Sequence, residues 1–173
     1  ELKLVDALPY KNPGNYIRYS ETLAKSIVNE HGVLWANQFD NLSNKKSHYL
    51  TTGPEIYKQL SQKVDAFICS IGTGGTISGV SDFLKEKNKN IVIGLADPMG
   101  SAMHNFYKNG KLKSTGSSIT EGIGQGRITK NLENAIIDQS FQITDTEALN
   151  IVYEMVRKEG LILGGSSGVN IMG

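Results

Sequence analysis

The chain has 173 residues, and its 18 lysines and arginines nearly balance its 17 aspartates and glutamates, which gives a formal net charge of +1. Without a run of like charges, this composition argues against nucleic-acid binding and against attachment to a charged membrane surface. No apolar stretch reaches the roughly 18 residues that a membrane span requires. The length fits one domain, or one domain with part of another.

The only cysteine, Cys69, lies in an apolar run and cannot form an internal disulfide. We interpret it as a buried small hydrophobic residue, and we expect a reducing, cytoplasmic location. The sequence begins at Glu1 without a methionine and ends at Gly173, where a further helix is expected to be under way. We therefore expect an internal piece of a longer chain.

The first sixty residues predict short, alternating elements. Residues 2–7 are typical of a strand, and the prolines within residues 8–14 predict a loop. Apolar residues at helical spacing predict a helix over residues 23–32. The asparagine-rich residues 39–46 predict a loop, and a second apolar face predicts a helix over residues 49–60.

The middle of the chain carries the clearest strands. Residues 64–71 and 91–96 are apolar and β-branched enough to predict strands that are buried on both faces. Between them, apolar residues from Ile77 to Leu84 share one helical face. Residues 99–126 lack periodicity and contain several glycines, which predicts a long loop with a functional role.

The last third predicts a strand, a long helix and another strand. Residues 141–143 are typical of a short strand, and Thr144 with Glu147 three residues later forms a capping box. The helix that follows is expected to end at Gly160, and residues 161–163 predict a further strand. Alternating strands and helices predict an α/β fold with a doubly wound, mainly parallel sheet and flanking helices.

A glycine-rich turn follows the strand predicted over residues 64–71, and its sequence is Gly72-Thr73-Gly74-Gly75-Thr76. Ligands bind at the carboxyl ends of strands in such sheets. Glycines let backbone N–H groups approach a ligand, and the start of the next helix adds free N–H groups. The turn therefore predicts a phosphate-binding loop, and a tight turn that only requires glycine remains the alternative. It is not a Walker loop, because no lysine follows the glycines.

A second glycine-rich turn, Gly164 to Gly168, follows the strand predicted over residues 161–163. The hydroxyl of Ser166 could cap the next helix. It could instead form a hydrogen bond with a heteroaromatic nitrogen. By itself the turn leaves both interpretations open.

Several segments taken together resemble the cysteine synthases. They keep the order and spacing of that family from about Leu8 to the end of the chain, although each is weak alone. The matching segments are residues 35–41, 48–49 with 51–56, 64–65, 72–76 with 78–80, 121–124 and 160–168. Cystathionine β-synthases share much of this pattern.

The resemblance implies part of a two-domain, fold type II pyridoxal-phosphate enzyme. Residues 1–41 would be the latter part of the smaller domain. Residues 42–173 would be the larger, phosphate-binding domain, incomplete at its C-terminus. The resemblance also implies that Ser166 forms a hydrogen bond with the pyridine nitrogen of the cofactor. The residues that it assigns to the cofactor phosphate are Gly72, Thr73, Gly74, Gly75 and Thr76.

The same resemblance assigns residues to the substrate. It implies that Gln38 helps to bind the substrate carboxylate, with a structural hydrogen bond as the alternative. It implies that the loop containing Gly122, Ile123 and Gly124 lies over the open face of the cofactor. The chain lacks the family's serine-x-lysine-aspartate type of motif, which carries the lysine that bonds the cofactor. No catalytic residue is therefore assigned, and we expect the chain to be inactive by itself.

The reaction implied is a β-replacement that makes L-cysteine from O-acetylserine and sulfide, with pyridoxal 5'-phosphate as the cofactor. A small amino-acid substrate, a homodimer and serine acetyltransferase are the partners that the resemblance suggests. A cystathionine β-synthase or an amino-acid dehydratase is an alternative within the enzyme class. A truncated, non-catalytic paralogue that acts as a binding module is an alternative of another class.

The remaining charged residues of interest are interpreted as structural or solvated. We expect Arg127 to lie in solvent, with an anionic substrate as its other interpretation. His48 is expected to be satisfied by its neighbours at a helix start, and His31 and His104 are expected in loops. The lysines expected in solvent are Lys11, Lys45, Lys46 and Lys130.

Overall fold

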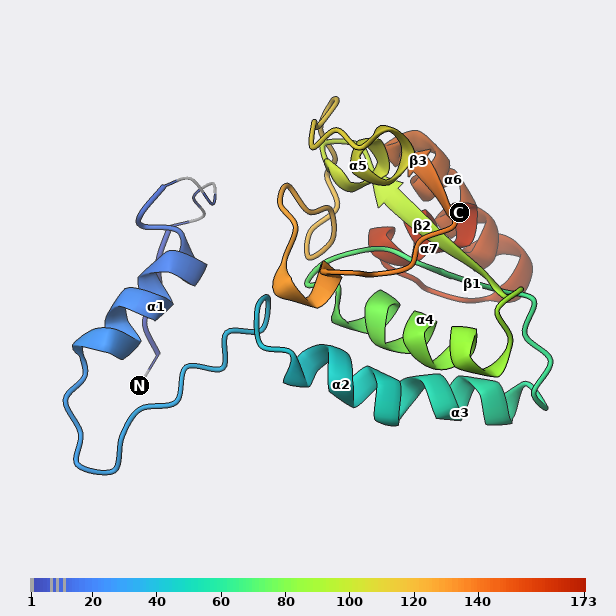
Figure 1. Ribbon diagram of the computed structural model, residues 1–173. Helices are drawn as coiled ribbons and strands as arrows, with labels where there is room; N and C mark the ends of the chain where they lie inside the picture. The colour runs from blue at the N-terminus through green and yellow to red at the C-terminus, as the bar shows by residue number, and fades with distance from the viewer. Residues whose placement is uncertain (1, 7, 9, 11) are drawn as a thin grey trace. The chain divides into compact units, whose positions relative to one another are not determined.

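A computed structural model describes residues 2–6, 8, 10 and 12–173, and it divides the chain into two units, residues 1–38 and 39–173 (Figure 1). The first unit contains one helix, α1 (Tyr16–Ser26), among its described residues. Asn15 caps this helix, since its Oδ1 accepts a hydrogen bond from the Ile17 N–H at 3.1 Å. The cap supplies an acceptor for one of the N–H groups that a helix start leaves without an intrahelical partner.

Two predictions for the first unit are wrong in detail. Residues 2–6 form no strand, and Leu2 and Leu4 are 84% and 86% exposed, so no strand or core covers them in the described part of the chain. The helix predicted to reach residue 32 ends at Ser26, and Val28 is 99% exposed. A helical apolar pattern forms a stable helix only where a core accepts its apolar face.

The second unit alternates helices with strands. Its elements are α2 (Ser43–Leu50), α3 (Thr52–Gln59), β1 (Ala66–Cys69), α4 (Gly75–Lys87), β2 (Val92–Pro98), α5 (Met103–Asn109), the short 3₁₀-helix η1 (Lys130–Leu132), β3 (Gln139–Ile143), α6 (Asp145–Glu159) and α7 (Gly165–Met172).

The three strands form one parallel sheet in the order β1-β2-β3. Ala66 pairs with Val92, and Gly94 pairs with Gln139. The helices between the strands complete the crossovers that parallel pairing requires. The prediction of an α/β fold with a mainly parallel sheet and flanking helices is confirmed.

Helices cover both faces of the sheet, and β2 shows this directly. Ile93 and Leu95 are fully buried in the core that α4 and α5 help to form. Ala96, one residue further along, lies in a second core with Val169 of α7. Successive side chains of a strand point to opposite faces, so the almost continuous apolar sequence of β2 reflects burial on both sides.

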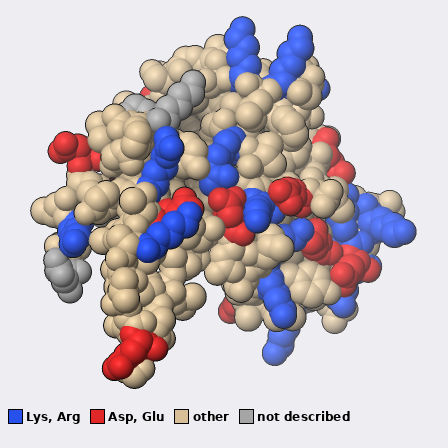
Figure 2. Space-filling model, turned by 60° about the vertical axis from the view of Figure 1, so that its left-hand side comes forward, with Lys and Arg blue, Asp and Glu red and all other residues tan. Residues whose placement is uncertain are grey.

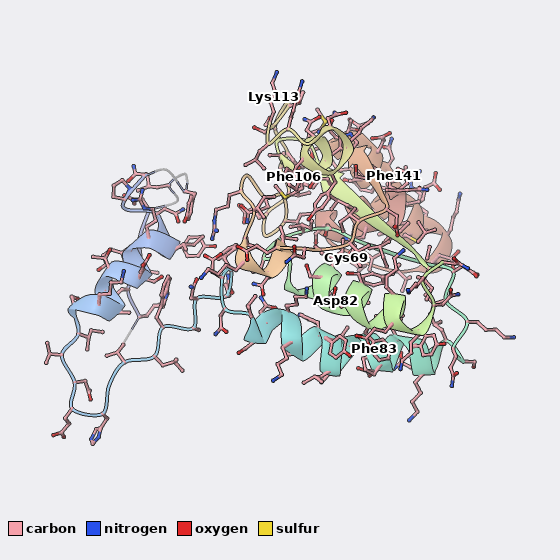
Figure 3. All side chains as sticks on the ribbon, in the orientation of Figure 1. Cys69, Asp82, Phe83, Phe106, Lys113 and Phe141 are labelled. Carbon is pink, nitrogen blue, oxygen red and sulfur yellow. The ribbon has the colours of Figure 1, made fainter. Side chains whose placement is uncertain are left out.

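Residues 42–60 form two helices where the sequence predicted a loop followed by one helix. Helix α2 begins at Ser43, inside the predicted loop, and the chain bends at Thr51, whose φ and ψ of −124° and −64° interrupt the helical path. Helices α2 and α3 pack along α4 (Figure 1). Phe83 of α4, which is labelled in Figure 3, makes edge-to-face ring contacts with Tyr49 and with Tyr57, each at 6.1 Å between ring centroids.

Three other predicted elements differ from the structure. Strand β1 is shorter than predicted and is not buried on both faces, since it lies at the edge of the sheet and Ile68 is 37% exposed. Residues 161–163 form no strand, and Ile162 is 89% exposed. The predicted loop 99–126 contains α5, which is too short to show a clear helical period.

The capping box is confirmed. The Glu147 N–H donates to Thr144 Oγ1 at 3.3 Å, while the Thr144 N–H donates to Glu147 Oε2 at 2.8 Å. The Thr144 hydroxyl, which donates to Glu147 Oε2 at 2.7 Å, and the Thr144 N–H hold the pKa of the Glu147 carboxyl below its usual value. Helix α6 ends at Glu159 and is capped by Gly160, whose φ of 68° is left-handed and suits glycine.

None of the helices in the described part of the chain combines the length and apolarity that a bilayer span requires. On the face that Figure 2 draws, basic and acidic side chains are intermingled. Cys69, predicted to be buried, is partly buried and packs against the core. Desolvation raises the pKa of its thiol to about 11, so the thiol stays protonated near neutral pH.

Replacement of Leu84 tests the core between α4 and the sheet. Leu84 is fully buried, so Leu84→Ala should lower the free energy of unfolding by about 2–5 kcal/mol. Leu112, which is 49% exposed, is the matched control, and Leu112→Ala should change it by less than about 0.5 kcal/mol. Urea denaturation followed by circular dichroism measures both values. Equal effects of the two variants would contradict the assignment of Leu84 to the core.

Candidate functional site

The glycine-rich residues 72–76 connect the end of β1 to the start of α4, at the carboxyl edge of the sheet. Gly74 has a left-handed φ of 87°, and the first helical bond runs from the Ser78 N–H to the Gly74 carbonyl. The N–H groups before Ser78 therefore lie in the first turn of α4, where the helix provides no intrahelical acceptor for them. An anion at this end also meets the positive end of the helix dipole.

Three consecutive carbonyl groups, that of Ile71 just before the loop and those of Gly72 and Thr73 within it, are bonded to one later segment. We call residues 122–132 the strap. Ile71 O accepts from the Gly124 N–H at 2.8 Å, and Gly72 O accepts from Gln125 Nε2 at 3.1 Å. Thr73 O accepts from Thr129 Oγ1 at 2.8 Å. The strap thus occupies the carbonyl oxygens, which would repel an anion, and leaves amides and hydroxyls as the polar groups of the loop.

The loop also requires glycine because neighbouring residues leave no space for a Cβ atom. A Cβ atom on Gly72 would lie 2.5 Å from Gly122 O. A Cβ atom on Gly74 would overlap Leu132, and one on Gly75 would overlap the amide of Asn44. The backbone of residues 72–75 is therefore enclosed by α2 on one side and by the strap on the other, which holds its amides in one arrangement.

Both threonine hydroxyls of the loop are bonded to α2. Asn44 Nδ2 donates to Thr73 Oγ1 at 2.9 Å. Thr76 Oγ1 lies 3.1 Å from His48 Nε2, and His48 Nδ1 lies 2.9 Å from Thr52 Oγ1. His48 is satisfied by its neighbours as predicted, although it lies in the last turn of α2 and not at a helix start.

The strap is fastened to the start of the second unit by an ion pair. Arg127 Nη1 and Nη2 donate to the two carboxylate oxygens of Asp40 at 3.1 and 2.9 Å. The Lys130 N–H donates to Asp40 Oδ1 at 2.9 Å. Arg127 is thus not a solvated side chain, and that prediction is wrong. The hydrogen bond from Arg127, with the Lys130 amide and despite partial burial, holds the pKa of Asp40 below its usual value.

A buried amide reinforces this connection. Asn131 Nδ2 donates to Phe39 O at 2.7 Å, and Asn131 Oδ1 accepts from the Lys45 N–H at 3.3 Å. The side chain of Asn131 is fully buried. The strap, residues 39–40 and α2 therefore form one hydrogen-bonded frame around the loop.

Ser166 lies in the first turn of α7 and is partly buried. Its carbonyl accepts from Asn170 Nδ2 at 2.7 Å, and the same amide group donates to Ser70 Oγ at 3.0 Å. Asn170 Oδ1 also accepts from the Ser70 N–H at 2.8 Å. This amide ties the start of α7 to the residues just before the glycine loop, so the structure places both glycine-rich turns at the same edge of the sheet.

The substrate residues implied by the resemblance are placed in two units. Gly122, Ile123 and Gly124 belong to the strap, where Gly124 bonds to Ile71 and the Gly122 carbonyl closely approaches Gly72. A pocket of about 310 Å³ lies beside them, lined by residues 98–101, 116–118, 120, 123 and 124. Gln38 belongs to the first unit, so its assignment to the substrate carboxylate stays a prediction.

Several sequence interpretations of other side chains need correction. Lys45 is not solvated, since its Nζ lies 2.7 Å from Asp82 Oδ2, while Lys46 and Lys130 are exposed as predicted. Lys11 lies outside the described residues. His104 is a buried residue of α5 and not a loop histidine, and this burial lowers its pKa. His31 is exposed in a turn, as predicted.

Asn44, Thr129 and Asn131 are site residues that the sequence analysis missed. Asn44 and Asn131 stood in polar, asparagine-containing stretches without periodicity. Only the pairing of segments far apart in the chain gives these side chains their partners, so no local signal identified them.

The sequence profile of a family described as pyridoxal-phosphate dependent enzymes matches residues 4–173. The chain belongs to this family. The matched residues include both glycine-rich turns.

Curated relatives agree with this assignment. The chain is 44% identical to cysteine synthase 1 of Neurospora crassa over 99% of its own length, and 44% identical to cysteine synthase 1 of Emericella nidulans. It covers 46% and 47% of these proteins, so it spans about half the length of the relatives that it matches.

A solved structure shows the same fold. It is an O-acetylserine dependent cystathionine β-synthase from Helicobacter pylori, with a TM-score of 0.77 and 33% identity. The match covers 90% of this chain and 47% of that one. The fold type II architecture is therefore shown for the part of the protein described here.

The residues present fit the cofactor of the family. The loop is closed against added side-chain atoms at Gly74 and Gly75, presents first-turn amides that have no intrahelical acceptor, and keeps the partly buried hydroxyls of Thr73 and Thr76 beside them. Neutral donors in this arrangement suit a phosphate group. Asp40 engages Arg127, so the guanidinium is paired and does not serve as a free cation for the loop.

The Asp40–Arg127 pair should make a pH-dependent contribution to stability. Exposed pairs contribute up to about 1 kcal/mol, and loss of one partner from a buried pair costs about 3–5 kcal/mol. For this partly buried pair we expect Asp40→Asn to destabilise the chain by about 1–2 kcal/mol near pH 6. The pKa of Asp40 is lowered from 3.8, so this stabilisation is complete above about pH 4 and is lost as the pH falls through the folded-state pKa.

Urea denaturation at about pH 6, 4 and 3 measures this difference. Glu154, which pairs with Lys158 in an exposed helical position, gives the control variant Glu154→Gln. The control should change the free energy of unfolding by less than about 0.5 kcal/mol. A loss for Asp40→Asn that stays constant from pH 6 to pH 3 would refute the ion-pair assignment.

Proposed function

We propose that residues 72–76 bind the phosphate of pyridoxal 5'-phosphate, and that the whole protein uses this cofactor to make L-cysteine from O-acetylserine and sulfide. The observation that carries the proposal is the hydrogen bonding of the loop. Its carbonyl groups accept hydrogen bonds from the strap, so its amides and two hydroxyls are the polar groups left to bind an anion. The similarity to two cysteine synthases supports the same reaction.

The roles of the other site residues are part of this proposal. Ser166 would accept or donate one hydrogen bond at the pyridine nitrogen, and a neutral hydroxyl there does not force that nitrogen to be protonated. When bound, the cofactor supplies an electron sink for the α-carbon of the amino acid. Gly122, Ile123 and Gly124 would limit access to that carbon, and Gln38 would hold the substrate carboxylate. In this family a lysine within a characteristic motif bonds the cofactor. None of the lysines among the 173 residues of the chain stands in such a motif.

The proposed location, oligomeric state and partner of the protein follow from the same family relationship. We propose a cytoplasmic homodimer in which residues 1–41 belong to the smaller domain and residues 42–173 to the larger one. Serine acetyltransferase is the proposed partner protein, because it would supply the O-acetylserine that the reaction consumes.

A second candidate reaction is O-acetylserine dependent cystathionine synthesis. The Helicobacter pylori structure, which is named for that activity, supports it. The two reactions share the amino-acid donor and differ in the thiol acceptor. Product formation with sulfide or with homocysteine, measured side by side on the whole protein, separates them.

Cofactor binding can be tested on the chain itself by equilibrium dialysis. The chain should retain pyridoxal phosphate and bind pyridoxal, which lacks the phosphate, at least tenfold more weakly. Loss of one hydrogen bond to a charged group costs about 1.5–3 kcal/mol, so Thr76→Val should weaken pyridoxal phosphate binding by about 10–100-fold. Thr115, an exposed threonine outside the loop, gives the control Thr115→Val, which should bind like the unaltered chain.

Two further measurements complete this test. After borohydride reduction, no single lysine of the chain should carry the cofactor, and the chain by itself should form no cysteine. Equal affinity for pyridoxal and pyridoxal phosphate would contradict the proposed phosphate loop. A specific reduced adduct on one lysine would show that the chain contains the cofactor-bonding residue after all.

A further inference from the structure

We propose that Asn44 and His48 of α2 are positioning residues that fix the hydroxyls of Thr73 and Thr76 as hydrogen-bond donors toward the bound phosphate. The proposal rests on the phosphate loop proposed above and assigns a role to two side chains outside it. Its basis is the hydrogen bonds that join these two hydroxyls to α2.

The hydroxyl of Thr73 accepts two hydrogen bonds. One comes from Asn44 Nδ2 at 2.9 Å and the other from the Gly75 N–H at 3.3 Å. A hydroxyl oxygen has two acceptor lone pairs and one proton. Because both lone pairs are engaged, the Thr73 hydroxyl can form one further hydrogen bond only by donating its proton. No acceptor for it lies among the residues that the structure describes, so it is available to a phosphate oxygen.

The hydroxyl of Thr76 belongs to a short chain of groups. Thr52 Oγ1 lies 2.9 Å from His48 Nδ1, and His48 Nε2 lies 3.1 Å from Thr76 Oγ1. In the tautomer with the proton on Nε2, the Thr52 hydroxyl donates to Nδ1 and the ring donates to Thr76. Thr76 then keeps its own proton for the phosphate. In the other tautomer Thr76 would donate its proton to the ring and have none for the phosphate, so the proposal requires the Nε2–H form.

The spacing of the residues makes both contacts possible at once. Asn44 and His48 are four residues apart, so they lie on the same face of α2. Gly75 and Gly79 are four residues apart on α4 and face them. A Cβ atom at Gly75 would overlap the Asn44 amide, and one at Gly79 would overlap Lys45 O and lie 2.8 Å from His48 Cβ. The two glycines thus let α2 approach the start of α4 closely enough for both bonds.

This arrangement differs from a purely structural contact between helices. If Asn44 and His48 only held α2 against α4, their loss would weaken the site whether or not the threonine hydroxyls were present. If they act through those hydroxyls, their loss should have no further effect once the hydroxyl is gone. A double-mutant cycle separates these cases, because it measures the coupling between the two side chains.

The experiment measures the affinity for pyridoxal phosphate of the unaltered chain, Asn44→Leu, Thr73→Val and the double variant. Leucine has nearly the size of asparagine and cannot donate. We expect Asn44→Leu to weaken binding about tenfold in the unaltered chain and less than twofold in the Thr73→Val background. Ser47→Ala, on an exposed position of the same helix, is the control and should leave the affinity unchanged.

A parallel set tests His48. His48→Leu should weaken pyridoxal phosphate binding about tenfold, while His48→Gln, whose side-chain amide can replace the Nε2–H donor, should restore most of the affinity. In the Thr76→Val background neither substitution should matter. Nitrogen-15 spectra of histidine-labelled chain should show His48 protonated at Nε2. Thermal denaturation of every variant checks that the chain remains folded.

The outcomes distinguish this proposal from the one on which it rests. An unaltered chain that does not bind pyridoxal phosphate would overturn both. An unaltered chain that binds it, with Asn44→Leu and His48→Leu losing as much affinity in the valine backgrounds as in the threonine ones, would overturn only the positioning role. A His48 ring protonated at Nδ1 alone would overturn the assigned direction of the Thr76 bond.

Discussion

The site depends on one constraint, which is that the carbonyl oxygens of Ile71, Gly72 and Thr73 all bond to the strap. A turn between a strand and a helix presents amides and carbonyls in similar numbers. Amide N–H groups attract an anion, whereas carbonyl oxygens repel it. Because a later segment of the chain takes up three consecutive carbonyls, the turn is converted into a surface of donors. The loop sequence alone does not achieve this.

Hydrogen bonds between distant segments explain why the other parts of the site are near. The turn after β1 lies at the carboxyl edge of the sheet, and Asn170 joins the start of α7 to it through Ser70. The Asp40–Arg127 pair and the Asn131 amide then attach the strap to residues 39 and 40. Each of these connections links residues that lie 87 or more positions apart in the sequence.

The features that the sequence predicted well are local ones. The glycine loop, the capping box at Thr144 and the buried strand β2 each follow from residues within a few positions of one another. The features that it missed depend on distant partners. Arg127 seemed solvated because nothing near it in sequence is acidic, and residues 161–163 have strand composition but no strand beside them in the described part of the chain. Helix α5 escaped notice because seven residues cannot show a helical period.

The contacts described for the loop include no lysine or arginine, and this has a consequence for how the site must work. A cation attracts a phosphate from many directions, but a neutral amide or hydroxyl does so only when its proton points at the anion. Oriented dipoles are effective when the protein has already fixed their direction before the ligand arrives. The enclosure of the loop by α2, Leu132 and the strap is therefore the means by which neutral groups bind a charged one. The pairing of Arg127 with Asp40 fits this logic, because an unpaired guanidinium near the strap would offer the phosphate a competing position.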